Sequence, residues 1–509
     1  MFENQPKALY ALALANTGER FGYYTMIAVF SLFLRANFGL SGNTAGLIYG
    51  VFLALVYFLP LVGGIMADKF GYGKMVTIGI IVMFAGYLFL SIPLGGGVMG
   101  YAAMFGALLL VSLGTGLFKG NLQVMVGNLY DAPELSAKRD SGFSIFYMAI
   151  NIGALFAPTA AVRIKEWAEH SLGYSGNDAY HFSFAVACVS LIVSMMIYYA
   201  FRSTFKHVEV GAGKSKKTDT AGTEEELTPQ QTKERIVALC LVFAVVIFFW
   251  MSFHQNGLTL TFFADEFVSP KSEGVQTMAF DVINLVMIIF MIYSLMSFFQ
   301  SKTSKAKLIS TVVFLAAVGV LVYKYHNIGG PVDVSAPIFQ QFNPFYVVAL
   351  TPVSMAIFSA LAAKGKEPTA PRKIAYGMII AGSAYLLMVL ASRGLLTPNE
   401  QAAAKAAGET VPFASGNWLI GTYLILTFGE LLLSPMGISF VSKVAPPKYK
   451  GTMMGGWFVA TAIGNLLVSV GGFLWNDIPL TIVWSVFIVL CLLSAGFMFL
   501  MMKRLEKVA

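Results

Sequence analysis

The sequence predicts an all-α integral membrane protein with fourteen transmembrane helices, and three observations carry this prediction. Of its 509 residues, 57% are apolar and only 12% are charged, which is about half the charged share of a soluble domain. The mean hydropathy is +0.72. The apolar residues fall in long runs without the alternation of barrel strands, so the runs are helices. These figures exclude a soluble globular enzyme, a disordered chain and a fibrous repeat.

A membrane-spanning helix needs about 20 mostly apolar residues, and fourteen runs meet that need. Six of them precede a polar stretch and eight follow it. We therefore expect a six-helix bundle over 1–201, a cytoplasmic linker over 202–235, and a second six-helix bundle over 236–509 with an extra helix pair at about 279–324. The runs lie near 8–34, 43–66, 75–93, 99–130, 142–162, 181–201, 236–263, 279–300, 307–324, 344–363, 373–392, 417–441, 451–474 and 480–502.

The expected linker is rich in charge, Thr, Gly and Pro. It contains the basic cluster Lys214–Lys217 and the acidic triplet Glu224–Glu226. Such a composition is typical of a solvated tether.

The 34 Lys and Arg residues predict how the helices are oriented. With the N-terminus placed in the cytoplasm, 25 of them fall in cytoplasmic segments, 7 in outer segments and 2 within helices. This bias sets orientation in membrane proteins, so both termini are expected in the cytoplasm. The same clustering accounts for the net charge of +8 without a nucleic-acid partner.

Four ionisable side chains lie within predicted helices. Each costs roughly 2.5–3.5 kcal/mol on insertion, so it marks a functional site by default. They are Glu19, Arg20, Lys119 and Glu430. Both cations come from the first half of the chain, and the second half supplies only an acid. A zwitterion fits such a site, with its carboxylate at the cations and its ammonium at Glu430. The alternative is a structural ion-pair network between helices.

One face of the first helix is polar along much of its length. Three- and four-residue spacing places on it Asn16, Glu19, Arg20, Tyr23 and Ile27. Tyr24 adjoins that face. Tyrosine has an apolar ring and a hydroxyl, which suits the wall of a wet cavity. An aromatic belt at the membrane interface is the alternative, but this stretch lies too deep for one.

The stretch after the second run reads GIMADKFGYGK. It fits the pattern G-x-x-x-D-[KR]-x-G-x-x-[KR] at every fixed position, which are Gly64, Asp68, Lys69, Gly71 and Lys74. Glycine allows a tight turn and a close approach of helices, and Asp68 can accept from a helix N-terminus or from the basic groups nearby. The stretch resembles the signature loop of the major facilitator superfamily, which implies the two-bundle transporter fold.

Several further segments resemble a narrower family. They begin at Glu19 (ERFGYY), Gly114 (GTGLFKGNLQVMVGNLYD), Phe143 (FSIFYMAINIGALFAP), Phe248 (FFWMSFHQNG), Gly429 (GELLLSPMGISFVSKVAP) and Gly451 (GTMMGGWFVATAIGNLL). These motifs are similar to those of the proton-dependent oligopeptide transporter family, the peptide branch of the major facilitators. The resemblance runs from the first helix to the last, and the 279–324 pair is the main region outside it.

The resemblance implies cotransport of di- and tripeptides with protons by alternating access. Arg20 and Lys119 would hold the peptide carboxylate. The peptide amino terminus would be held by Glu430 together with Asn151 and Asn343.

The resemblance also implies proton-coupling groups and a pocket wall. Glu19 and Glu430 would be the carboxylates whose protonation couples to Arg20 and Lys119. Protons are then the coupling ion, with no metal and no other cofactor. The wall of the substrate pocket would be formed by Tyr23, Tyr24, Tyr57, His254, Gln255 and Trp457.

Four positions depart from the family pattern. Asn16 replaces the first Glu of the helix 1 motif, and Gly120 replaces the Pro after Lys119. Ile27 and His254 replace the Arg and the Glu that usually form a gating ion pair. His254 is then either a polar packing residue or a group whose protonation opens the outer gate. Asn16 bears on the strength of proton coupling.

The leading hypothesis is a symporter that imports short peptides with protons. Its expected partners are short peptides and the lipid bilayer, and it is expected in the inner (plasma) membrane as a functional monomer. Alternatives are a carrier of another small solute, such as an amino acid or an anion, and a weakly coupled peptide facilitator. A non-transporting receptor is the hypothesis from another class. No metal cluster, nucleophile–base pair or phosphate-binding glycine loop indicates an enzyme.

Overall fold

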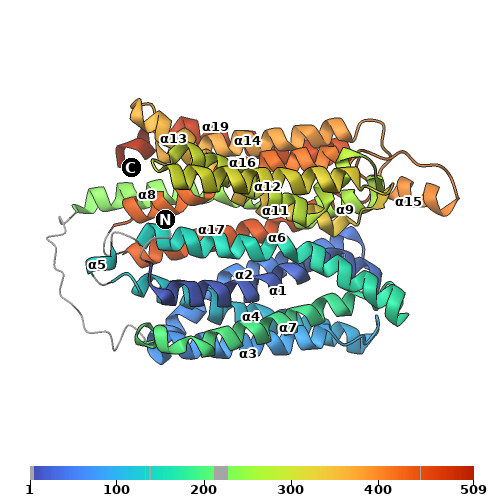
Figure 1. Cartoon of the computed structure of the whole chain (residues 1–509), viewed down its shortest axis with the longest axis horizontal. Helices are drawn as coiled ribbons and strands as arrows, with labels where there is room; N and C mark the ends of the chain where they lie inside the picture. Colours follow the sequence, from blue (N-terminus) through green and yellow to red (C-terminus); the bar gives the residue numbers. More distant parts are fainter. Residues whose placement is uncertain (1–4, 132, 137–138, 211–226, 447–448, 509) are drawn as a thin grey trace.

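The structure, a computed structural model, describes residues 5–131, 133–136, 139–210, 227–446 and 449–508. Long helices lie side by side along the longest axis of the molecule (Figure 1). Helices from the first two hundred residues form one half, and those that follow the linker form the other. Both termini lie at the end of the molecule from which the linker runs (Figure 1). This arrangement confirms the predicted all-α architecture of two helical bundles.

The first bundle is held together by contacts of α1 with α6 and α7, and of α4 with α2 and α3. Its elements are α1 (Lys7–Phe38), α2 (Gly42–Phe70), α3 (Tyr72–Leu90), α4 (Val98–Asn128), α5 (Pro133–Ser136), α6 (Arg139–Leu172), α7 (Tyr180–Ala200), and the 3₁₀ turns η1 (Arg202–Thr204) and η2 (Lys206–Val208). The motif-bearing helices α1 and α4 are therefore neighbours of the same bundle.

The second bundle packs α14 against α16 and α19, and α17 against α8. Its elements are α8 (Pro229–Phe253), η3 (His254–Gly257), α9 (Thr259–Phe267), β1 (Lys271–Ser272), α10 (Val275–Phe280), β2 (Val332–Asp333), η4 (Ala336–Gln341), α13 (Phe342–Ala363), α14 (Ala370–Ala391), α15 (Pro398–Ala406), α16 (Asn417–Val444), α17 (Lys450–Leu467), α18 (Ser469–Phe473) and α19 (Leu480–Val508). Strands β1 and β2 pair antiparallel through Lys271 and Asp333.

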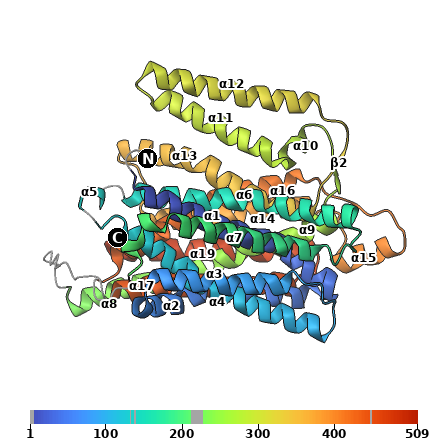
Figure 2. The same ribbon diagram turned by 60° about the horizontal axis from the view of Figure 1, so that its bottom comes forward.

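The extra pair consists of α11 (Val282–Gln300) and α12 (Ser304–His326). Figure 2 shows the two helices side by side at the edge of the molecule, outside the bundles. Helix α11 packs against the second bundle, where the Tyr293 hydroxyl donates to the Val348 carbonyl of α13 at 3.1 Å. An ion pair between Lys324 and Asp281 joins the end of α12 to the start of α11. The pair is thus a peripheral hairpin.

Thirteen helical segments in the described part of the chain are long and apolar enough to cross a membrane. Helix α1 is not among them, because Glu19, Arg20 and Arg35 lower its apolar character. It nevertheless runs alongside α6 and α7 within the bundle (Figure 2). With α1 the number of spanning helices is the fourteen that the sequence predicts.

The stretch 64–74 is not the loop that the sequence predicts. Helix α2 continues to Phe70 and α3 begins at Tyr72, so Gly71 alone separates them. Gly71 has a φ of +98°, which glycine adopts without steric cost. The Asp68 carboxylate accepts from the Tyr72 hydroxyl at 2.7 Å, rather than from a helix N-terminus or a lysine. The signature is therefore a one-residue connection between two helices.

The expected linker is partly folded onto the first bundle. Phe205 and Val208 are buried, and the Glu209 carboxylate pairs with Arg202 at 2.8 Å. This hydrogen-bonded pairing raises the pKa of Arg202. The Gly73 amide of α3 donates to the Glu209 carbonyl at 3.2 Å. The prediction of a wholly solvated tether is thus wrong for these residues, because their apolar side chains have a surface to pack on.

The middle of the linker, with Lys214–Lys217 and Glu224–Glu226, lies outside the described residues. Helix α8 begins at Pro229, earlier than the expected 236, because Thr228 and Gln231 form a capping box. The division of the chain into two bundles and a linker remains a prediction in its exact boundaries.

Two predicted helices are broken. The run 236–263 breaks at η3, and the run 451–474 breaks at Val468. The two breaks lie together, because the Gln255 amide donates to the Val468 carbonyl at 3.0 Å and to the Met251 carbonyl at 3.1 Å. A side chain from one break thus satisfies a backbone group freed at the other, which is how broken helices persist inside a membrane protein.

Candidate functional site

Helix α1 carries a buried ion pair between neighbouring residues. The Nε and Nη2 atoms of Arg20 donate to the two carboxylate oxygens of Glu19. The exposed fraction is 0% for Glu19 and 3% for Arg20. The guanidinium also lies 4.8 Å from the centroid of the Tyr23 ring. In this conformation the two charges neutralise each other, so Arg20 does not present an uncompensated cation.

Lys119 of α4 is a charge without a carboxylate partner. Its Nζ lies 3.9 Å from the centroid of the Tyr57 ring of α2, a cation–π contact. In the part of the chain that the structure describes, Lys119 forms no ion pair. The side chain is half-buried although it sits in the middle of a membrane helix. A ligand carboxylate would supply the counter-charge that Lys119 lacks.

Glu430 of α16 is the matching charge in the other bundle. One carboxylate oxygen accepts from Asn343 Nδ2 at 2.9 Å, and the same amide donates to Thr427 at 3.0 Å. No cation of the described residues pairs with Glu430, whose exposed fraction is 8%. Glu430 and Asn343 are thus in contact, and their role in holding a peptide amino terminus stays a prediction. A buried carboxylate with one hydrogen bond has acceptor capacity left for an ammonium.

The two unpaired charges share a tyrosine neighbour. Tyr57 lies against Lys119 and is also close enough to Glu430 for an electrostatic interaction. Tyr24 and Tyr147 interact with Glu430 in the same way. The cation of one bundle and the acid of the other are therefore separated mainly by tyrosine side chains.

His254 lies beside this region, at the first residue of the break after α8. Its ring stacks on Trp250 with 5.2 Å between centroids and tilts toward Tyr57 at 6.2 Å. His254 Nε2 and Trp250 Nε1 are buried and have no hydrogen-bond partner in the described structure. Lys119 is near enough to interact electrostatically with the imidazole. His254 Nε2 and Trp250 Nε1 thus remain without hydrogen-bond partners, and His254 lies near Lys119.

Several residues that the resemblance places at the substrate are buried and already have contacts within the protein. Gln255 is fully buried, and its side-chain amide bridges the two helix breaks. Its place in the wall of a substrate pocket stays a prediction. Trp457 is 3% exposed, and its indole lies against Gly437, where an added Cβ would meet the ring. Asn151 is 7% exposed and donates to the Tyr147 carbonyl at 3.0 Å.

Two site residues were missed by sequence reasoning. Trp250 stands four residues before His254 and Tyr147 stands four residues before Asn151, so each shares a helix face with a predicted residue. That spacing was the available signal. Aromatic residues are frequent throughout the chain, at 14%, and this frequency hid the two positions.

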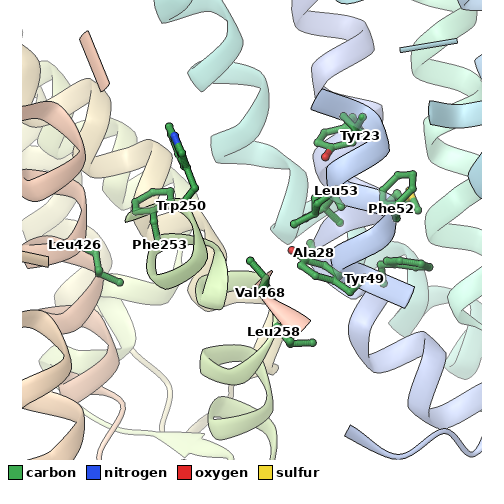
Figure 3. Packing of buried hydrophobic residues seen from close by; sticks show 14 of the residues in the cluster. Tyr23, Ala28, Tyr49, Phe52, Leu53, Trp250, Phe253, Leu258, Leu426 and Val468 are labelled. Carbon is green, nitrogen blue, oxygen red and sulfur yellow. The ribbon is translucent and has the colours of Figure 1, made fainter. Parts of the chain in front are cut away.

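The two bundles meet closely at the end of the molecule away from the termini. Figure 3 shows Leu258 and Val468 of the second bundle opposite Ala28 and Tyr49 of the first. Hydrogen bonds there join Gln340 to Ala28, Thr159 to Gln341, and Asn476 to Asn43. An ion pair joins Arg35 of α1 to Glu266 of α9. These contacts close the interface on one side of the charged region.

The described residues contain no group of three or more His, Cys, Asp or Glu side chains that could hold a metal ion. Two bundles of membrane-crossing helices, with unpaired charges of opposite sign between them, are typical of a multi-pass membrane transporter.

The chain belongs to the POT family, whose model matches residues 73–221 and 324–483. Among curated relatives it is 27% identical to dipeptide and tripeptide permease B of Xenorhabdus bovienii over 481 residues, which cover 92% of this chain and 86% of that one. It is 29% identical to the di-/tripeptide transporter of Lactococcus lactis subsp. cremoris over 497 residues, which cover 92% and 89%.

Solved structures share the fold at lower sequence identity. A peptide transporter POT in complex with sulfate superposes with a TM-score of 0.74 at 22% identity, covering 100% of this chain and 96% of that one. A POT family transporter in complex with 5-aminolevulinic acid gives 0.73 at 20% identity, covering 100% and 98%.

Proposed function

We propose that this chain is a proton-coupled symporter that imports di- and tripeptides by alternating access. The observation that carries the proposal is the pair of unpaired charges, Lys119 in one bundle and Glu430 in the other, which share a tyrosine neighbour. The two termini of a short peptide carry the complementary charges. The relatives named as dipeptide and tripeptide permeases support the same cargo.

In this proposal the substrate binds between the two unpaired charges, Glu430 and Lys119. Glu430 and Asn343 accept the peptide ammonium, and Lys119 holds the carboxylate. Tyr24, Tyr57 and the aromatic surface of Trp250 enclose the backbone between them. Because these groups bind the charged termini that all short peptides share, the site accepts peptides with different side chains.

Arg20 enters this scheme through Glu19. While Glu19 is ionised, its carboxylate forms an ion pair with the Arg20 guanidinium. A proton on Glu19 removes the charge that Arg20 pairs with, and the guanidinium then becomes available to a peptide carboxylate beside Lys119. Proton binding and peptide binding are thereby linked through one ion pair, and Glu430 is the second carboxylate that can take up a proton.

The proposed carrier works in the inner (plasma) membrane with both termini in the cytoplasm, as the distribution of Lys and Arg supports. The closed end, with α9 and α15, is then the outer one. A single chain contains all the proposed site residues, which supports a functional monomer.

The test is uptake of a labelled dipeptide into proteoliposomes, with and without an imposed pH gradient and membrane potential. One charge moved across 100 mV is worth roughly 2.3 kcal/mol, which corresponds to about 40-fold accumulation for one proton per neutral peptide. Liposomes without protein are the control. Equilibration that ignores both gradients means a facilitator, and binding without any uptake means a receptor.

A further inference from the structure

A pocket lies at the end of the molecule away from the termini, and neither Lys119 nor Glu430 lines it. It has a volume of about 430 Å³, within the usual range for small-molecule sites. Both bundles contribute to it through α1, α7, α9 and α15, which meet at the end away from the termini (Figure 1). Its charged and hydrogen-bonding side chains include Arg35, Tyr180, Asp265, Glu266, Gln401 and Lys405.

Glu266 is fully engaged in this pocket. Its carboxylate pairs with Arg35 across the bundle interface and accepts from Trp475 Nε1 at 3.3 Å. Its backbone carbonyl accepts from Lys405 Nζ at 2.8 Å and from Gln401 at 3.2 Å. Glu266 therefore ties α1 to the second bundle and is not free for a ligand.

Asp265, the neighbouring residue, is free. Its side chain is exposed in the pocket, and none of the described residues donates a hydrogen bond to it or forms an ion pair with it. The cations near enough to interact with it electrostatically are Arg35, Lys405 and Lys165. Lys165 is already paired with Glu169. The pocket thus holds one carboxylate that has no partner of its own.

Free donors lie in the same pocket. Arg35 uses Nη1 for Glu266 and keeps the other N–H groups of its guanidinium. Lys405 uses one of its three ammonium protons for the Glu266 carbonyl. The formal charges of Arg35, Lys405, Asp265 and Glu266 cancel. The pocket consequently offers an acceptor for an ammonium and donors for a carboxylate, without a net charge that would reject a neutral zwitterion.

We propose that this pocket is an outer docking site for zwitterionic short peptides, with the ammonium on Asp265 and the carboxylate on Arg35 and Lys405. The inference rests on the proposed function, because the short peptides that it places in this pocket are the substrates proposed there. A carboxylate on Arg35 competes with Glu266 for the guanidinium. Occupation of the pocket therefore loosens the ion pair that joins α1 to α9, and the arriving peptide favours opening of the outer end.

The test compares Asp265→Asn with the unchanged chain in intact cells that lack other peptide carriers. We expect the KM for external dipeptide to rise about tenfold, because one charge-assisted hydrogen bond is lost. The maximal rate should stay unchanged. The KM for an N-acetylated dipeptide stays within twofold, because that peptide has no ammonium. Efflux KM, measured from the opposite face in everted vesicles, stays within twofold.

Glu409→Gln is the matched control, because Glu409 is an exposed acid on the same end but does not line the pocket. An equal rise in KM in the control indicates general surface attraction and overturns the docking site. An unchanged KM in Asp265→Asn, or an equal rise for the acetylated peptide, also overturns it while peptide transport stands. Absence of uptake by the unchanged chain overturns the proposed function itself.

Discussion

Removing Arg20 leaves the buried Glu19 carboxylate without its ion-pair partner, whereas removing Lys119 leaves no carboxylate unpaired. Removing one member of a buried ion pair leaves an uncompensated charge, which costs about 3–5 kcal/mol. We therefore expect Arg20→Ala to lower the melting temperature in detergent markedly. Lys119→Ala should keep the melting temperature of the unchanged chain and still lose concentrative dipeptide uptake. Near-normal accumulation by Lys119→Ala would remove Lys119 from the carboxylate site.

Glu430→Gln keeps the shape of the side chain and its contact with Asn343, and removes the negative charge. Dipeptides with a free N-terminus should lose about 1.5–3 kcal/mol of binding free energy, as expected for a charge-assisted hydrogen bond. An N-acetylated dipeptide should lose little. The measurement is competition against labelled peptide for both ligands, and equal losses contradict recognition of the amine.

His254 stands in place of a gating Glu, and a variant at this position tests whether its imidazole takes up a proton during transport. Its Nε2 atom is buried without an acceptor, and a proton there would add a second positive charge beside Lys119. We expect the imidazole to act as a neutral neighbour, so His254→Gln should leave the acid stimulation of uptake in place. Uptake measured from pH 5.5 to 8 tests this, and a flattened profile would restore the alternative of a proton-driven outer gate.

At the scale of elements, glycines set the contact between α2 and α18. Gly46 lies so near Gly472 that an added Cβ would come within 3.0 Å of its Cα, and within 3.2 Å of Leu258. Gly46→Leu should therefore keep the outer ends apart and abolish turnover. Gly64→Leu is the matched control on the same helix, because no atom lies within 4 Å of a Cβ there.

The separation is measured with spin labels at Leu47→Cys and Phe473→Cys in a chain whose own cysteines are replaced by serine. Both side chains are exposed and lie on α2 and α18. We expect a longer label distance in Gly46→Leu and an unchanged one in Gly64→Leu. Equal distances in the two variants would show that the glycine contact does not govern closure.

At the scale of the whole molecule, the α11–α12 hairpin is separable from the carrier. The buried share of its apolar stretches is 22% and 11%, against 50% for α3 and α4. No proposed site residue lies on it. Replacing residues 282–326 with a short Gly-Ser linker should leave dipeptide uptake in proteoliposomes within about twofold, since the bundles keep their contacts.

Tyr293→Phe is the milder companion variant, because it removes only the hydrogen bond to Val348. It should behave as the unchanged chain. A folded deletion variant that binds peptide but no longer accumulates it would give the hairpin a part in the transport cycle.

The sequence alone identified the four charged residues in the membrane helices, because a charge in an apolar run is costly enough to need a function. It could not tell which partner each charge takes. Residues adjacent in a helix do not normally face each other, yet the Arg20 guanidinium pairs with the Glu19 carboxylate, and it also lies close enough to Lys119 to interact with it electrostatically. Helix α1 packs against α6 and α7, which are far from it in the chain, so local sequence does not encode the surroundings of this pair.

Hydropathy and charge distribution determined the class of protein and the number of helices, because the bilayer requires about 20 apolar residues for each crossing. The motifs determined the family. Only the tertiary structure decided that Gln255 and Val468 join two helix breaks. It also decided that Gly71 alone connects α2 and α3, and that Asp265 lies in a pocket between the bundles. Each of these depends on contacts between residues far apart in the chain, which local pattern and composition do not encode.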